Sequence, residues 1–423
     1  MRFLQKDRFL QAILPFLMIF TFIFFSCSGK GNATQKKEIR FSWWGKEDRA
    51  EYTLNGISHF ESLNPSIKVN PEYSSWIDYE KKFGERLLSG NCADVMLINF
   101  DWLYKYSPDG NGFYDMHEIS DYLELYNFTL DDLSYGTMNG KLNAIPIAFN
   151  TAIPVYNMTE LKRDNLSLPS TWDELFSMAK VLKQKGMHVF TISKRHLFFL
   201  ALSWFEQNYS KKVFSEDGTL KVNTEEIGVI FDFVKSLVKE NVIYSINEGF
   251  SLHALREKKV AGAVLWCNET SIFISEVEKL GGKAVLGNFI STPGAKESGW
   301  YLKPASMYAI KKDCKNPKEA AMLVNYLLNN HDFALLQKND KGVPISNRSL
   351  TALMKNQSLE SMQYTALMKI RFNSGSINKM LPIMDDNALI LGFADNAFAY
   401  INGQESKEEA SKAFMETVNL LTK

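Results

Sequence analysis

The chain of 423 residues carries 48 Lys and Arg against 48 Asp and Glu, and 45% of its residues are hydrophobic. This length suits two or three globular domains with buried cores, which excludes an intrinsically disordered or collagen-like chain. The zero net charge argues against a nucleic-acid-binding protein, because neutralising phosphates requires a surplus of Lys and Arg.

The N-terminal segment is typical of an export signal. Three basic residues among the first eight precede an apolar run over 12–25, which is shorter than the about 20 residues that span a membrane. The run is followed by Ser26 and Cys27, which resemble a bacterial lipoprotein cleavage box. We predict a signal peptide over 1–27, lipidation of Cys27 and a flexible tether over 28–38. Ordinary cleavage nearby, with Cys27 left free, is the alternative.

Cysteine and histidine patterns give no metal or redox signature. Three cysteines, Cys92, Cys267 and Cys314, remain after cleavage, and an odd number at these spacings cannot form a complete disulfide framework. The sequence leaves open whether any two of them pair. The six histidines occur singly, without ligand spacing, so we expect no metal site and no cofactor.

The first part of the mature chain alternates strand and helix patterns. We predict strands over 39–44, 67–69 and 94–98, and helices over 48–63 and 76–88. Strand-helix-strand order at this spacing indicates βαβ units with a parallel sheet. Such sheets bind ligands beyond the carboxyl ends of their strands, so residues that follow each strand are candidates for a binding site.

An extended segment over 143–157 carries two prolines, which favours an edge or interdomain strand over a central one. A helix opens near Ser170 and Thr171, with acidic residues in its first turn. Further patterns predict helices over 197–207, 224–240 and 269–280, and strands over 260–266 and 283–290. A short apolar run at 308–310 and a helix that opens at 316 begin a return of the chain, and the C-terminal part from 349 is mostly helical.

Several motifs in this order resemble one known family. NGKLNAIP at 139–146 is followed by Tyr156-Asn157 and by LPSTWDE at 168–174, with further similar runs at 93–95, 101–103, 315–321 and 342–345. Together they resemble the bacterial extracellular solute-binding proteins that serve ABC sugar importers, the maltose-binding-protein-like group. The resemblance covers essentially the whole mature chain.

The resemblance implies an α/β fold of the two-lobe periplasmic-binding-protein type (type II), with an interlobe ligand cleft and hinge crossings. The N-lobe would comprise 39–147 and 302–342, and the C-lobe 148–301 and 343–423, with crossings near Phe149 and Gly342. The implied function is a substrate-binding lipoprotein that captures a carbohydrate and delivers it to a membrane ABC permease by hinge closure. We expect an exported monomer that is attached to a bacterial membrane only by its lipid.

A sugar presents hydroxyls and an apolar C–H face, so its site needs aromatic planes together with fixed carboxylates or amides. In the resembled family, contacts come from a charged pair after the first strand, here Lys46 and Glu47, and from an acid after the third, here Asp101. Asn150 replaces a further acid in the first crossing. The candidate ligand-binding residues are Trp43, Trp44, Lys46, Glu47, Asp101, Trp102, Phe149, Asn150, Trp266, Asn268 and Glu269.

Other interpretations compete with this one. The tryptophans named above are alternatively core residues, and Glu47 and Asp101 alternatively cap helices. Trp76, Trp172 and Trp204 lie on predicted helices, where packing is the expected role, although Trp204 could face the cleft. A polyamine, a peptide or another small polar solute is a possible alternative ligand. No nucleophile-elbow, zinc-protease, P-loop or dinucleotide motif occurs, so we expect no enzyme, and a carbohydrate-active enzyme is the weakest alternative.

Overall fold

The computed structural model describes residues 36–245, 249–357, 364–365, 368–369 and 377–421. The predicted signal peptide and Cys27 lie outside these residues, as does most of the predicted tether. The first strand already begins at Lys37, so the last two residues assigned to the tether belong to the folded part.

One sheet has nine strands among the described residues, and seven of them follow the order β2-β1-β3-β10-β6-β8-β7. β11 pairs with β10, and β9 pairs with β6. The strands are β1 (Lys37–Trp44), β2 (Ile67–Ser74), β3 (Val95–Ile98), β6 (Ala144–Asn157), β7 (His188–Ile192), β8 (Val260–Trp266), β9 (Ala284–Leu286), β10 (Tyr301–Ile310) and β11 (Asn378–Lys379), and a separate hairpin joins β4 (Thr137–Met138) to β5 (Lys141–Leu142).

The helices form two groups around the two ends of this sheet. The first group comprises α1 (Glu47–Leu63), α2 (Trp76–Leu88), α3 (Asp101–Tyr106), α4 (Leu130–Ser134), α11 (Pro317–Asn329), α12 (His331–Gln337) and α13 (Asn347–Lys355), with short 3₁₀ turns η1 (Met116–Tyr122) and η2 (Leu125–Asn127). The second comprises α5 (Met158–Arg163), α6 (Trp172–Lys183), α7 (Lys194–Tyr209), α8 (Thr224–Lys239), α9 (Leu252–Arg256), α10 (Thr270–Lys279), α15 (Asn387–Ile401) and α16 (Lys407–Leu421). We keep the names N-lobe and C-lobe for these groups and the strands they cover.

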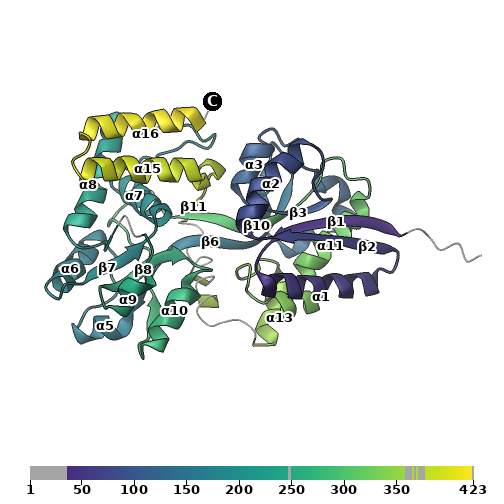
Figure 1. The fold of residues 1–423 in the computed structure, drawn as a ribbon, viewed down its shortest axis with the longest axis horizontal. Coiled ribbons are helices and arrows are strands. Elements are labelled where there is room, and N and C mark those ends of the chain that lie inside the picture. The colour runs from purple at the N-terminus through teal and green to yellow at the C-terminus, as the bar shows by residue number, and fades with distance from the viewer. Residues whose placement is uncertain (1–35, 246–248, 358–363, 366–367, 370–376, 422–423) are drawn as a thin grey trace, which may run out of the picture. The chain divides into compact units, whose positions relative to one another are not determined.

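The predicted elements of the first βαβ units are confirmed. β1 pairs in parallel with both β2 and β3, and all four residues of β3 are buried, as expected of a parallel strand covered on both faces. In Figure 1, α2 and α3 lie on one side of these strands and α1 lies on the other. The helix near Ser170 begins with Thr171 as its N-cap, whose side chain and that of Glu174 form a capping box.

β6 is a central strand that joins the lobes, so the prediction of an interdomain strand is confirmed and the alternative of an edge strand is wrong. All of its residues are buried; its first part pairs with β10 and its last part with β8 and β9. Proline removes only the amide donor, and the carbonyl can still pair: Gly287 N donates to the carbonyl of Pro154 (2.7 Å). The strand therefore runs from one lobe into the other inside the sheet.

The last crossing lies further along the chain than predicted. α13 packs against α11 and α12: Ser346 Oγ donates to Asn329 Oδ1 (2.6 Å), and Arg348 pairs with Glu124 (2.8 Å). Residues 343–357, assigned to the C-lobe from the sequence, thus contact the N-lobe. Lys369 already donates to Gly287 O of the C-lobe (3.1 Å). β11 and the 3₁₀ turn η3 (Pro382–Asp385) then lie at the junction of the lobes, where η3 contacts both α3 and α15.

Candidate functional site

The strands that join the lobes bring a group of charged side chains together. Lys303 on β10 pairs in register with Asn150 on β6. The Lys303 ammonium forms an ion pair with Asp385 of η3, and Arg195, at the start of α7, forms a second ion pair with the same carboxylate. Arg195 also donates to the main-chain oxygen of Asp385 (3.0 Å). Two cations from different elements therefore hold one buried carboxylate, whose side chain is only 1% exposed.

Asp101 lies beside this group, at the start of α3. Burial raises the pKa of its carboxyl to about 7, and the negative charge of Asp385 adds to this effect, whereas the charge of Lys303 opposes it. Asn99 Nδ2 donates to Asp101 Oδ1 (2.5 Å). Near neutral pH, Asp101 can therefore either donate or accept a hydrogen bond.

Glu269 approaches the same cations from the start of α10. Burial raises the pKa of Glu269, and the charges of Lys303 and Arg195 act against that shift. Among the described residues, neither Asp101 nor Glu269 forms an ion pair. Asp385 is thus the acid committed to the cations, and Asp101 and Glu269 retain hydrogen-bonding capacity.

A cavity of about 390 Å³ adjoins Glu269 on the C-lobe side. The starts of α7 and α15 and the end of β8 line it, through Ser193, Lys194, Arg195, His196, Phe250, Leu265, Trp266, Glu269, Asn387, Ile390 and Leu391. Burial lowers the pKa of His196 to about 3, so its ring is neutral, and its Nδ1 lies 2.8 Å from Ser193 Oγ. The volume falls within the range of small-molecule pockets.

Trp266 lines this cavity, and its ring is in contact with a cation. Its side chain is buried, the Lys303 ammonium lies 5.0 Å from its ring centroid, and His196 meets it edge-on at 5.1 Å. A cation over the ring uses the attraction that a sugar face would otherwise exploit. Trp266 therefore contacts the charged group through Lys303, and its stacking on a sugar stays a prediction.

The N-lobe side carries a cluster of tryptophans beyond the ends of β1 and β2. Trp44 meets Trp76 edge-on (4.9 Å between centroids), and Trp76 stacks on Trp102 (5.8 Å). Trp102 is buried against Phe83 (4.0 Å), so it is a core residue, whereas Trp44 and Trp76 are half-buried. The expectation that Trp76 is only a packed helix residue missed its place beside Trp44.

Four other predicted ligand residues are either buried by packing or exposed at a helix start. Trp43 is 1% exposed and stacks on Tyr73, so it belongs to the core. Phe149 is buried and packs against Tyr135 (4.8 Å). Lys46 and Glu47 are exposed at the start of α1. Lys46 is the N-cap, but no side-chain cap bond forms there or at the start of α3, so the capping roles weighed for Glu47 and Asp101 are not seen.

Comparison with known proteins places the chain in a family. A family model described as "Bacterial extracellular solute-binding protein" matches residues 57–363. The chain belongs to this family. Membership implies an exported protein, and it agrees with the two-lobe α/β fold described above. The expectation of a binding protein rather than an enzyme fits the family.

Three similar proteins show how far this likeness reaches. The multiple sugar-binding protein of Streptococcus mutans serotype c is 28% identical over 179 residues, which are 41% of each chain. The present chain therefore spans less than half the length of this curated relative. A periplasmic oligogalacturonide-binding protein of Yersinia enterocolitica, in complex with saturated digalacturonic acid, is 28% identical (TM-score 0.80; 91% of this chain and 99% of that one). A de novo designed cysteine esterase is 27% identical (TM-score 0.84; 92% and 100%).

In this solute-binding protein, Asn150 is a structural residue at the crossing. Its Nδ2 donates to Asn268 Oδ1 (2.8 Å), and its own Oδ1 accepts from the thiol of Cys267 (3.0 Å). These bonds tie β6 to the end of β8 and use the Oδ1 atoms of Asn150 and Asn268. That either residue holds ligand stays a prediction.

The described residues give no sign of metal or thiol chemistry. They contain no group of three or more His, Cys, Asp or Glu side chains arranged to hold a metal ion. Burial raises the pKa of Cys267 to about 11, which keeps its thiol protonated and poorly nucleophilic. No helix in the described part of the chain is long and apolar enough to span a membrane.

Proposed function

We propose that this solute-binding protein binds a carbohydrate between its lobes and delivers it to a membrane ABC permease. The observation that carries the proposal is the pair of acids, Asp101 and Glu269, that lie near the Asp385 group and form no ion pair. Asp101 belongs to the N-lobe and Glu269 to the C-lobe, so one solute could bind both lobes. The likeness to a sugar-binding and an oligogalacturonide-binding protein supports the same class of solute.

The chemistry of the two acids suits sugar hydroxyls. A hydroxyl both donates and accepts, so it can pair with either protonation state of a carboxyl whose pKa is raised. Half-buried Trp44 and Trp76 would offer an apolar surface for the C–H face of a ring. A neutral sugar also enters without adding a charge to a region that already holds Arg195, Lys303 and Asp385.

A cationic solute such as a polyamine is the second candidate. The group contains three acids, Asp101, Asp385 and Glu269, and two cations, Arg195 and Lys303. A bound ammonium would balance this excess. A peptide or another small polar solute, and a carbohydrate-active enzyme, remain less favoured, since no observation of the site points to them.

Thermal-shift measurements with neutral oligosaccharides, digalacturonate and spermidine separate these candidates, because only a ligand of the folded state raises the melting temperature by mass action. For the solute found, Glu269→Gln should weaken binding at least about tenfold, or about 1.4 kcal/mol. Glu278→Gln, an exposed position on the same helix, is the control and should leave affinity unchanged. Stabilisation by spermidine alone would replace the carbohydrate proposal with the polyamine one.

Hinge closure is the mechanism we propose for delivery. The chain crosses between the lobes through β6, β10 and β11, and several short crossings restrict relative motion of the lobes to bending. A solute bound by both lobes favours the closed form by its higher affinity for that form. The radius of gyration measured by small-angle scattering should therefore fall at saturation, and an unchanged radius would contradict closure.

A further inference from the structure

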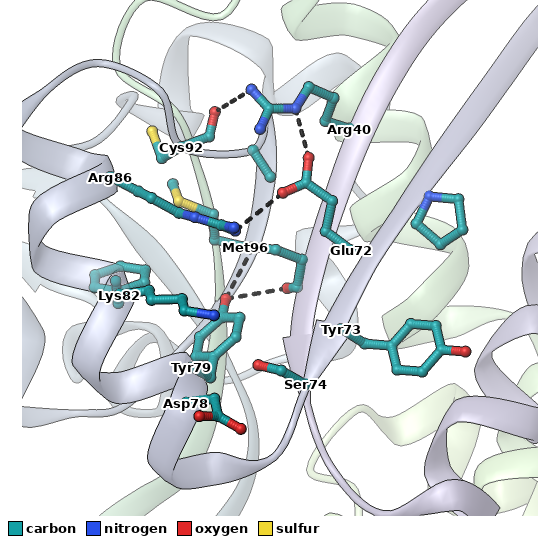
Figure 2. Close-up of a pocket in the computed structure, with 14 residues that line it drawn as sticks. Arg40, Glu72, Tyr73, Ser74, Asp78, Tyr79, Lys82, Arg86, Cys92 and Met96 are labelled. Carbon is teal, nitrogen blue, oxygen red and sulfur yellow. Dashed lines mark hydrogen bonds and ion pairs between the residues drawn. The ribbon is translucent and has the colours of Figure 1, made fainter.

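A second cavity lies in the N-lobe and shares no lining residue with the cavity beside Glu269. It measures about 520 Å³ and lies between α2 and the strands β1 and β2 (Figure 2). Its lining includes the apolar side chains of Phe83, Ala93 and Met96, together with the ring of Tyr79. We call it the α2–β2 pocket. Its volume is that of a site for a small organic molecule.

One acid in the α2–β2 pocket is shared between two arginines. Arg40 Nε donates to Glu72 Oε1 (2.5 Å), and Arg86 NH1 donates to Glu72 Oε2 (3.2 Å). Other N–H groups of Arg40 donate to main-chain oxygens such as that of Cys92 (3.2 Å). The bond to Glu72 is the one side-chain hydrogen bond of Arg86 among the described residues, so most of its guanidinium donors remain unused.

Lys82 adds a further cation one turn before Arg86 on α2. It lines the pocket, and Figure 2 shows it reaching from the helix toward the strand that carries Glu72 and Ser74. The Lys82 side chain forms no hydrogen bond or ion pair within the described part of the chain. The remaining acid, Asp78, accepts from Ser75 Oγ (2.7 Å) at the start of the helix.

The lining therefore holds three cations against two acids: Glu72 is shared between Arg40 and Arg86, and Asp78 is bonded to Ser75. The Lys82 charge has no acid as its partner within the described residues. We propose that the α2–β2 pocket binds a small organic anion, a carboxylate carried on an apolar body. The carboxylate would pair with the Lys82 ammonium and the unused donors of Arg86, since charge-assisted bonds to guanidinium and ammonium groups are the strong ones. The apolar body would lie against the lining edge of Phe83, because Met96 is fully buried and offers no surface. This proposal is independent of the carbohydrate proposed for the other cavity.

Isothermal titration with benzoate as the probe tests the proposal, with benzamide as a neutral analogue of the same shape. Benzoate should bind in the millimolar range and more weakly as salt is raised, whereas benzamide should not bind. Lys82→Gln should lower the benzoate affinity about threefold to fivefold, and Arg86→Gln should act in the same direction. Lys81→Gln, an exposed neighbour on α2 that does not line the pocket, should change nothing.

Several results would overturn the proposal. These are no benzoate binding up to about 20 mM, equal binding of benzamide, or unchanged affinity in both Lys82→Gln and Arg86→Gln. Inorganic phosphate that binds as well as benzoate would mean a simple anion site and would remove the apolar body from the proposal. Because Lys82 has no partner to lose in the described structure, Lys82→Gln should keep the wild-type melting temperature and so report on binding alone.

Discussion

Replacing Asp101 with Asn should stabilise the folded protein at alkaline pH. An acid whose pKa is raised on folding costs stability once the pH exceeds its pKa in the unfolded chain, and the cost grows until the pH passes the folded value. For Asp101 these values are 3.8 and about 7. The cost is then about 2 kcal/mol at pH 5 and about 4 kcal/mol at pH 8, using 1.36 kcal/mol per pKa unit.

Asparagine keeps the shape of the side chain and the acceptor for Asn99, but it carries no charge at any pH. The amide also has a pH-independent effect on stability, which cancels in this comparison. The stability of Asp101→Asn relative to wild type should rise by about 2.6 kcal/mol between pH 5 and pH 8. Urea unfolding followed by circular dichroism at both pH values measures this difference. Asp121→Asn, at an exposed position, should show almost none.

The opposite result would identify a different cause. If attraction to Lys303 outweighed burial, the pKa of Asp101 would lie below its usual value. Asp101→Asn would then lose stability relative to wild type as the pH rises from 3 to 5. A pH-independent difference between the two proteins would show that Asp101 ionises in the folded protein as it does in the unfolded chain, and the argument from burial would be wrong.

Three further substitutions test the fold and the anchor. Asp385→Asn leaves the buried ammonium of Lys303 without its carboxylate and should cost about 3–5 kcal/mol in urea unfolding, whereas Asp395→Asn breaks an exposed ion pair and should cost at most about 1 kcal/mol. Gly342→Ala should lower the melting temperature, because φ is +95° there and the new Cβ would lie 2.8 Å from a neighbouring alanine Cβ; an unchanged melting temperature would contradict the strain. Cys27→Ser should move the protein from the membrane fraction to the soluble fraction, or leave its signal peptide uncleaved, if the lipid is its anchor; wild-type fractionation and migration would contradict lipidation.

Local pattern was enough to predict the elements around the site. Periodicity predicts β1, α1 and α2. The rule that ligands bind beyond strand ends identifies Asp101 and Glu269 as candidates from the sequence alone. One refinement was also available from the sequence. Successive side chains of a strand point to opposite faces, so Trp43 and Trp44 could not both face the same cluster, and the structure places only Trp44 beside Trp76.

The centre of the charged group could not be predicted in this way. Arg195 and Asp385 are 190 residues apart, and Lys303 and Asp385 are 82 apart, so no window of sequence contains the contact. Arg195 follows the end of β7 and could have been flagged by the strand-end rule. Asp385 lies on a short 3₁₀ turn that no periodicity marks, and its role depends on where the third crossing enters the sheet.

The position of that crossing suggests why the site is built around Asp385. Its turn, η3, contacts α3, where Asp101 begins the helix, and also α15 of the C-lobe. Lys303 and Arg195 fix the Asp385 carboxylate to β10 and α7, so η3 is held at the crossing whether or not a solute is present. A solute that bonds to Asp101 and Glu269 would then draw α3 and α10 together around a fixed centre. We infer that the two cations serve chiefly to hold this centre, because both are already committed to Asp385, and that the uncommitted acids supply the contacts that distinguish one solute from another.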